Sequence, residues 1–216
     1  MNTLIRRLLT IALLASGCQL AAATSPGEAI RPIQTQWAEI KYKLPEKQQA
    51  ERYHALALEV RKLVETNPDM AEALIWEGIV LSSEAGAKGG LGALSLAKEA
   101  RDRLEAARSL NEAALNGSAY TSLATLYAKV PRWPIGFGDM ERAESYFKKS
   151  LGINPDGIDP NYFYGEFLVD NNRVAEARPF LEKALKAAPR PGRELADRGR
   201  RQEVQALLNK LNQEAR

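Results

Sequence analysis

Residues 154–189, NPDGIDPNYFYGEFLVDNNRVAEARPFLEKALKAAP, decide the fold of this chain. Pro155 and Pro189 lie 34 residues apart, and each follows a segment rich in helix-forming residues. Gly165 occupies the first half, where a small residue lets a second helix approach closely. In the second half, small and apolar residues recur at i, i+4 and i+7, which is one face of a helix: Ala177, Leu181 and Ala184. The stretch therefore predicts two helices that pack against each other.

Two earlier segments repeat this pattern. The helical face recurs as Ala143, Phe147 and Ser150 and, one unit earlier, as Ala100, Leu104 and Ala107. The small residues of the first helices align ten residues after the preceding terminators Pro68, Glu112 and Pro155: they are Gly78, Ser122 and Gly165. A pair of helices every 34 residues is typical of the tetratricopeptide repeat. The sequence therefore predicts an all-α fold, a tetratricopeptide-like helical-repeat solenoid.

The expected repeat domain covers residues 46–216. Residues 46–65 predict a long helix, which is either a cap or a degenerate half-repeat. Residues 194–212 are polar on most faces, as a C-terminal capping helix is expected to be. Residues 24–45 contain prolines and predict a tether with a short helix near residues 36–41.

Two units exceed the 34-residue period, and both excesses fall between the first and second helix. Pro68 and Glu112 are 44 residues apart, and Glu112 and Pro155 are 43 apart. The insertions cover residues 85–92 and residues 130–138. Equivalent turns of stacked repeats lie on one edge of a solenoid, where insertions often build the binding face. We therefore expect two neighbouring loops that frame a binding site.

The N-terminus resembles an export signal, and residues 1–23 are predicted to be a signal peptide. Arg6 and Arg7 precede a short apolar run, which is too short to span a bilayer. Two processing sites compete: a signal-peptidase site at Ala21–Ala23, and a lipobox-like stretch ending at Cys18, the only cysteine. Lipidation of Cys18 predicts an outer-membrane lipoprotein, and cleavage after Ala23 predicts a soluble periplasmic protein.

Composition excludes several classes of function. The 30 basic and 27 acidic residues give a formal charge of +3, which does not indicate a nucleic-acid partner. His54 is the only histidine, too few for a zinc site, and a structural role is expected for it. The glycines around Lys88 do not have the spacing of a phosphate-binding loop. The sequence therefore predicts a protein that is not an enzyme and needs no cofactor.

Candidate binding residues come from the insertions and from the last full repeat. Loops are normally polar, so apolar residues in the second insertion indicate either an interaction site or a plug that folds back on its own repeat: Trp133, Pro134, Ile135 and Phe137. Lys88 in the first insertion is placed to meet a carboxylate. Tyr162 or Tyr164 is expected to line a pocket, and the other to be core.

A group of arginines near the C-terminus has two interpretations. It is either a solvated face or a site for an anionic ligand or acidic partner: Arg190, Arg193, Arg198, Arg200 and Arg201.

Two segments, VPRWPIGFGD at residues 130–139 and GINPDGIDPNYFYG at residues 152–165, resemble the TatT family of tetratricopeptide-like components of TRAP transporters. The resemblance covers roughly residues 46–211. It implies an envelope lipoprotein that associates with a periplasmic solute-binding protein, forms a homotrimer, and captures small apolar carboxylates.

The expected function is therefore that of a non-catalytic accessory protein in the uptake of small ligands. The alternative is a tetratricopeptide scaffold for protein assembly in the cell envelope, without a small ligand.

Overall fold

The computed structural model describes residues 25–214, so the expected signal peptide and Cys18 lie outside the described residues. Within this range the chain forms nine α-helices and one short 3-10 helix, with no β-strand, and the all-α prediction is confirmed. The helices are α1 (Pro26–Lys43), α2 (Glu46–Thr66), α3 (Ala71–Lys88), α4 (Gly90–Leu110), η1 (Ala114–Asn116), α5 (Ser118–Lys129), α6 (Met140–Ile153), α7 (Ile158–Asp170), α8 (Val174–Lys186) and α9 (Glu194–Glu214).

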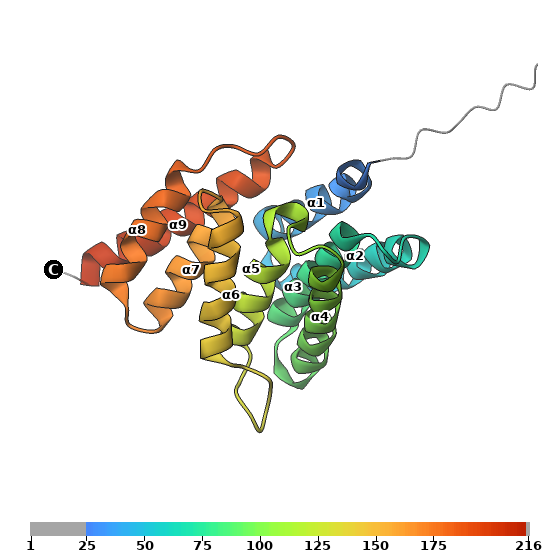
Figure 1. The fold of residues 1–216 in the computed structure, drawn as a ribbon, viewed down its shortest axis with the longest axis horizontal. Helices are drawn as coiled ribbons and strands as arrows, with labels where there is room; N and C mark the ends of the chain where they lie inside the picture. The colour runs from blue at the N-terminus through green and yellow to red at the C-terminus, as the bar shows by residue number, and fades with distance from the viewer. Residues whose placement is uncertain (1–24, 215–216) are drawn as a thin grey trace, which may run out of the picture.

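The helices pack as a row of antiparallel pairs, as Figure 1 shows. The pairs α3–α4, α5–α6 and α7–α8 are the three expected repeats, and α1–α2 precedes them. The first helix of each pair packs on the first helix of the next, in the order α1, α3, α5 and α7. This stacking buries a continuous core, which is how repeats that are unstable alone stabilise one another.

The predicted repeat faces are buried between the two helices of each pair. Ala143, Ala177 and Ala184 are fully buried, as their helical spacing indicates. Gly165 shows why small residues are needed there: a Cβ atom added to it would lie 2.7 Å from Leu181 Cδ2. Gly78 faces Leu104 in the same way: a Cβ atom added to Gly78 would lie 2.5 Å from Leu104 Cγ. Helix separation in these two repeats is therefore set by the glycine.

The middle repeat departs from the predicted register. Ala124, not Ser122, occupies the position of Gly78 and Gly165, because Ala124 is fully buried and Ser122 is half-buried. The displacement arises before α5, where Leu115 and Asn116 adopt left-handed backbone angles in η1. The turn between α4 and α5 is therefore two residues longer than the alignment of Glu112 with Pro68 and Pro155 predicts.

The first insertion is not a loop, and that expectation is wrong. Residues 85–92 instead lengthen two helices, since α3 continues to Lys88 and α4 begins at Gly90. Gly89 makes the turn with a φ of 61°, a backbone conformation that glycine adopts without steric cost.

The second insertion is the loop between α5 and α6, and it packs beside α4. Arg101 of α4 lies 4.7 Å from the Phe137 ring centroid, and a Cβ added to Gly136 would lie 3.3 Å from Leu94 Cδ1. Figure 1 shows the α3–α4 turn and this loop at the same lower edge of the molecule. The prediction that the two insertions are neighbours is confirmed.

The expected tether over residues 24–45 is instead helix α1. Ser25 caps it with a capping box, and Pro26 occupies its first turn. Its apolar residues recur at helical spacing and are buried: Ile30, Ile33, Trp37 and Ile40. The tether was predicted from the prolines, and that prediction is wrong because Pro32 is exposed and is tolerated within the helix.

Helix α9 is a terminal helix with an additional role. It packs on α7 and α8 and also on α1, which closes the row of repeats into a ring. At this closure Gly199 faces Tyr42: a Cβ atom added to Gly199 would lie 2.4 Å from the nearest ring carbons of Tyr42. Among the described helices, none is long and apolar enough to cross a bilayer.

Replacing Gly165 with alanine tests the repeat packing. Gly165→Ala is expected to lower the free energy of unfolding by roughly 1–3 kcal/mol, because the new methyl group overlaps Leu181 in a packed core. Gly152→Ala is the control, since its Cβ meets nothing within 4 Å and alanine favours helix by about 0.4–1 kcal/mol. Urea denaturation measures both variants, and equal stability of the two would contradict this account of the repeat.

Candidate ligand cavity

The ring surrounds a cavity of about 790 Å³ that is partly open to solvent. Its wall is formed by residues of α1, α2, α3, α5, α7 and α9, together with the turns before α5 and α9. The first helices of the repeats supply this wall because their outer sides are packed against the second helices. A volume of this size is in the range of sites for small molecules.

One side of the cavity is aromatic. Trp37 and Trp76 meet edge to face with ring centroids 6.0 Å apart, and Trp37 Nε1 donates to Ser83 Oγ at 2.9 Å. On the opposite side, Tyr162 and Phe163 of α7 line the wall. The cavity therefore offers aromatic contact area on a wall that also carries many polar and charged side chains.

A charged network holds α9 against α7 and α1. Asp159 accepts hydrogen bonds from Arg190 Nη1 at 2.6 Å and from Arg200 Nε at 3.0 Å. Arg200 Nη1 also donates to Glu203 at 2.6 Å, and Tyr42 of α1 donates to the same carboxylate at 3.3 Å. Because Asp159 belongs to α7, these bonds link three helices around one end of the cavity.

The network shifts the pKa values of its members. Burial alone would raise the pKa of Asp159, but Arg190 and Arg200 hold it well below its ordinary value. Burial raises the pKa of the Tyr42 phenol, with Glu203 adding to that effect and Arg200 opposing it. The carboxylate is thus ionised at neutral pH, and the phenol is neutral and able to donate.

The C-terminal arginines do not form one solvated face. Arg198 is exposed, but Arg200 is only 6% exposed and stacks over Tyr162 and Phe163, with its Cζ 4.5 and 4.4 Å from their ring centroids. Arg201 donates to the carbonyl of Ala187. The prediction of a solvated face therefore holds for Arg198 and is wrong for Arg200.

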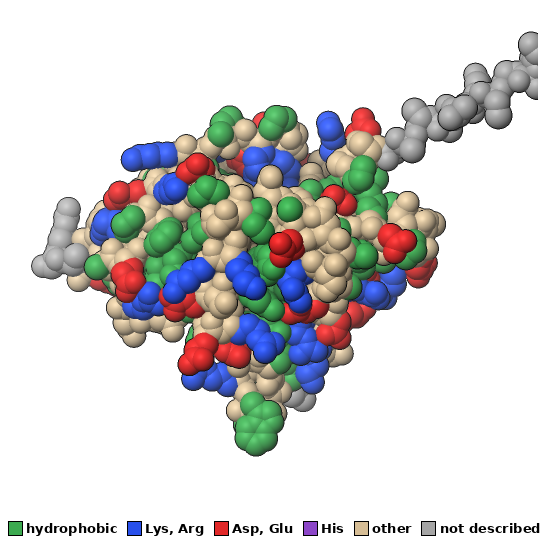
Figure 2. Space-filling model, viewed as in Figure 1, with side chains coloured by type: hydrophobic (Ala, Val, Ile, Leu, Met, Phe, Trp, Pro, Cys, Tyr) green, Lys and Arg blue, Asp and Glu red, His purple; other side chains and the backbone are tan. Residues whose placement is uncertain are grey.

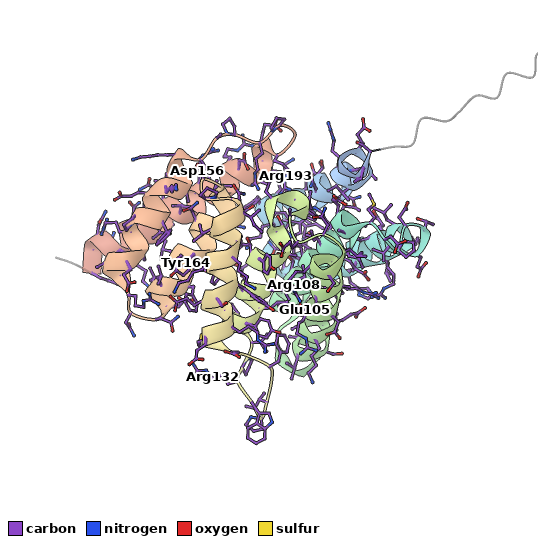
Figure 3. All side chains as sticks on the ribbon, in the orientation of Figure 1. Glu105, Arg108, Arg132, Asp156, Tyr164 and Arg193 are labelled. Carbon is purple, nitrogen blue, oxygen red and sulfur yellow. The ribbon has the colours of Figure 1, made fainter. Side chains whose placement is uncertain are left out.

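Of the seven predicted binding residues, only Tyr162 lines the cavity. Its hydroxyl donates to Glu166 at 3.0 Å. Tyr164 is the core member of the pair: Figure 3 shows it among α6, α7 and α8, where it packs on Phe147 and Phe180. Tyr164 donates to Glu144 at 3.1 Å, and burial followed by that carboxylate raises its pKa to about 12.

The remaining predicted residues lie at the edge that carries the insertions and do not line the cavity, although Gly86 and Ala87 of the first insertion do. Phe137 packs on Tyr127 with ring centroids 5.5 Å apart, so it is a plug. Trp133 and Ile135 are 86% and 68% exposed, and Pro134 is exposed beside them. Figure 2 shows this apolar loop tip projecting from the lower edge. Phe137 is therefore the plug, and an interaction site at the exposed side chains Trp133, Pro134 and Ile135 stays a prediction.

Lys88 is exposed at the end of α3 and does not line the cavity. Its aliphatic chain passes over Gly92: a Cβ atom added to Gly92 would lie 3.2 Å from Lys88 Cε. His54 of α2 approaches the buried carboxylate of Glu84 on α3, with 3.0 Å between His54 Nδ1 and Glu84 Oε1. This contact between neighbouring helices fits the structural role expected for the histidine.

The sequence prediction missed most of the cavity wall, including Trp76, Tyr53 and Asp159. These residues lie on α2, α3 and α7, and in a helix an aromatic or acidic residue does not by itself indicate a cavity rather than ordinary core or surface. A usable signal was present in α1, whose apolar face indicated a helix that needed a partner.

Comparison with known families supports the repeat assignment for part of the chain. A tetratricopeptide repeat model matches residues 135–197, which contain α6, α7, α8 and the start of α9. No curated protein matches the sequence. The match and the helical pairs together show a tetratricopeptide-like helical-repeat fold.

Removing the charge of Asp159 tests the network that closes the ring. Asp159→Asn is expected to lower the free energy of unfolding, because two arginines lose their shared carboxylate. The loss should lie at the lower end of the roughly 3–5 kcal/mol seen when a buried ion pair is broken, since the side chain is 29% exposed.

The pH dependence gives a second readout for the same variant. A depressed pKa stabilises the fold above the unfolded value, about 4 for aspartate, and this stabilisation is lost as the pH falls toward the folded value. In urea denaturation the difference between wild type and Asp159→Asn should therefore be constant from neutral pH to about pH 5 and shrink as the pH falls below about 4. A difference that stays unchanged below about pH 4 would contradict the assigned charge interaction.

Two substitutions separate the two roles within the α5–α6 loop. Phe137→Ala is expected to cost roughly 1–3 kcal/mol of stability, less than a fully buried phenylalanine, because the ring is only partly buried. Trp133→Ala is expected to change stability by less than about 0.5 kcal/mol, because it is exposed. Thermal unfolding measures both, and a large loss for Trp133→Ala would assign that side chain to the plug.

Proposed function

We propose that this protein is a non-catalytic binding protein that holds a small organic ligand in the cavity inside its ring of repeat helices. The observation that carries the proposal is the closure of α9 on α1 around a cavity of about 790 Å³. A tetratricopeptide-like fold fits this role, since such proteins generally act as binding scaffolds.

The position of α9 favours a small ligand over a bound peptide. In an open solenoid the concave surface is available along its length to an extended partner. Here α9 packs on α7 and α1 and supplies Arg200 to the cavity wall, and the turn before α9 supplies Arg190 and Arg193. The space left inside the ring therefore suits a molecule of limited size with apolar surface.

The α5–α6 loop supports a protein partner as a second part of the proposal. Trp133 and Ile135 expose apolar surface at a rigid tip, and such surface is typical of interaction sites. The partner that the resemblance to the TatT family suggests is a periplasmic solute-binding protein, with this chain as an accessory protein of a TRAP transporter. Export to the envelope, a lipid anchor at Cys18 and assembly into a homotrimer belong to the same proposal.

The alternative function is a scaffold for protein assembly in the envelope. Exposed Trp133 favours it, because a loop of this kind needs no ligand in the cavity to bind a partner. Ligand binding in the cavity separates the two functions, since the scaffold alone does not require it.

Filling the cavity tests the proposed function. Ser122 of α5 lines the cavity and is half-buried, so Ser122→Trp should fill part of the space and weaken binding of octanoate and octanol at least about tenfold. Ser145→Trp is the control, because Ser145 is exposed on α6. Isothermal titration calorimetry measures binding, and circular dichroism should report unchanged helix content. Unaltered binding by Ser122→Trp would show that the probes bind elsewhere.

A further inference from the structure

Hydroxyl groups on two adjacent helices line the cavity. Helix α3 contributes Ser82 and Ser83, and α5 contributes Ser118, Ser122 and Thr125. All of these residues are half-buried, so each keeps some surface that a ligand can reach. Because α3 packs directly on α5, as Figure 1 shows, the two sets belong to one continuous part of the wall. A small ligand in the cavity can therefore contact hydroxyls of both helices at once.

Most of these hydroxyls have already given their proton to the backbone. Four of them donate to a main-chain carbonyl three or four residues earlier, at 2.7–2.9 Å: Ser82, Ser83, Ser118 and Thr125. A carbonyl only accepts and a hydroxyl carries one proton, so the direction of each bond is fixed. The oxygens therefore offer lone pairs to a ligand. Ser83 has used one of its two lone pairs on Trp37 Nε1.

Gln49 of α2 adds an acceptor of a different kind. Its Nε2 donates to the carbonyls of Lys41 and Leu44, at 3.4 and 3.1 Å. Both bonds require N–H groups, so they identify the nitrogen of the amide and leave Oε1 as the group still to be bonded. Gln49 itself lines the cavity. Acceptors on the wall therefore come from α2, α3 and α5.

The charges of the wall are mostly paired with one another. Among residues 25–214, the exceptions are Arg193, whose Cζ lies 5.0 Å from the Trp76 ring centroid, and Glu46, which has the opposite charge. A charged ligand has to compete with the existing ion pairs, whereas an uncharged ligand leaves them intact. The pairs are Lys41 with Glu203, Lys129 with Glu166, and both Arg190 and Arg200 with Asp159.

We propose that the cavity binds the sugar head group of an uncharged glycoside. This inference rests on the proposed function, because it names the class of ligand in that cavity. A sugar supplies several O–H donors to a wall rich in acceptors, and its ring also has apolar C–H surface. Ile79, one turn before the α3 hydroxyls, Leu115 and Phe163 line the same cavity and supply apolar contact area.

Three further side chains favour a sugar over a ligand that only donates, such as an ammonium ion. Gln34, Asn116 and Ser122 line the cavity, and their side chains take no part in the hydrogen bonds within residues 25–214. Amides and hydroxyls both donate and accept, as sugar hydroxyls do. An ammonium ion uses only their acceptors and brings a charge. The uncharged class also differs from the carboxylate that the resemblance to the TatT family implies.

The test compares ligands that share an octyl chain, by isothermal titration calorimetry below their micellar concentrations. Octyl β-glucoside carries a sugar, octanol a single hydroxyl and octanoate a carboxylate. Wild type is expected to bind octyl β-glucoside at least about tenfold more tightly than octanol, because the sugar adds several neutral hydrogen bonds. Octanoate is expected to bind more weakly than octyl β-glucoside, because it has no donor for the acceptors of the wall.

Removing one acceptor tests the wall itself. Thr125→Val nearly keeps the shape of the side chain and should weaken octyl β-glucoside roughly two- to tenfold, with a smaller effect on octanol. Thr35→Val is the matched control, because the exposed Thr35 of α1 makes the same kind of bond, to the carbonyl of Arg31, and does not line the cavity. Both variants lose one such bond, so their Tm values should change alike.

The outcomes distinguish the sugar site from the cavity function. If octanol binds as tightly as octyl β-glucoside, or octanoate binds more tightly, the glycoside is wrong and the ligand cavity stands. The acceptor wall is wrong if Thr125→Val weakens octyl β-glucoside no more than Thr35→Val does. Unchanged binding of octyl β-glucoside by Ser122→Trp would place this ligand outside the cavity and overturn the inference. If wild type binds none of the three ligands, both the sugar site and the proposed function are wrong.

Discussion

The closure between α9 and α1 is the contact on which the rest of the structure depends. At this point a side chain at position 199 would overlap Tyr42, and Tyr42 and Lys41 of α1 both bind Glu203 of α9. A glycine within a helix costs about 1 kcal/mol relative to alanine, so close approach at this point is the physical reason for one. Without this closure the inner faces of the repeats would form an open concave surface.

The cavity and the stability of the ring impose opposite demands on its wall. Arg190 and Arg200 are satisfied by internal carboxylates, and they stabilise the ring. Tyr53, Trp76 and Arg193 keep buried donors without a partner, which costs stability in the ligand-free protein. The wall therefore combines groups that stabilise the ring with groups that weaken it.

The repeats could be predicted from the sequence because their spacing reflects local helix geometry. The face of Ala177, Leu181 and Ala184 is a property of one helix, and burial follows directly from it. The register of the middle repeat was predicted wrongly, because η1 uses two residues whose left-handed angles have no clear sequence signal. Ala124 and Ser122 consequently exchange roles, and the cavity receives Ser122.

The sequence by itself determined the helical class, the repeat pairs and the neighbouring positions of the two insertions. Only the tertiary structure decided that α1 packs as a helix, that α9 meets it, and that Tyr162 rather than Tyr164 lines the cavity. The physical reason is the distance along the chain. Periodicity acts within one helix or one repeat, whereas the contact between Tyr42 and Gly199 depends on the accumulated twist of all the repeats between them.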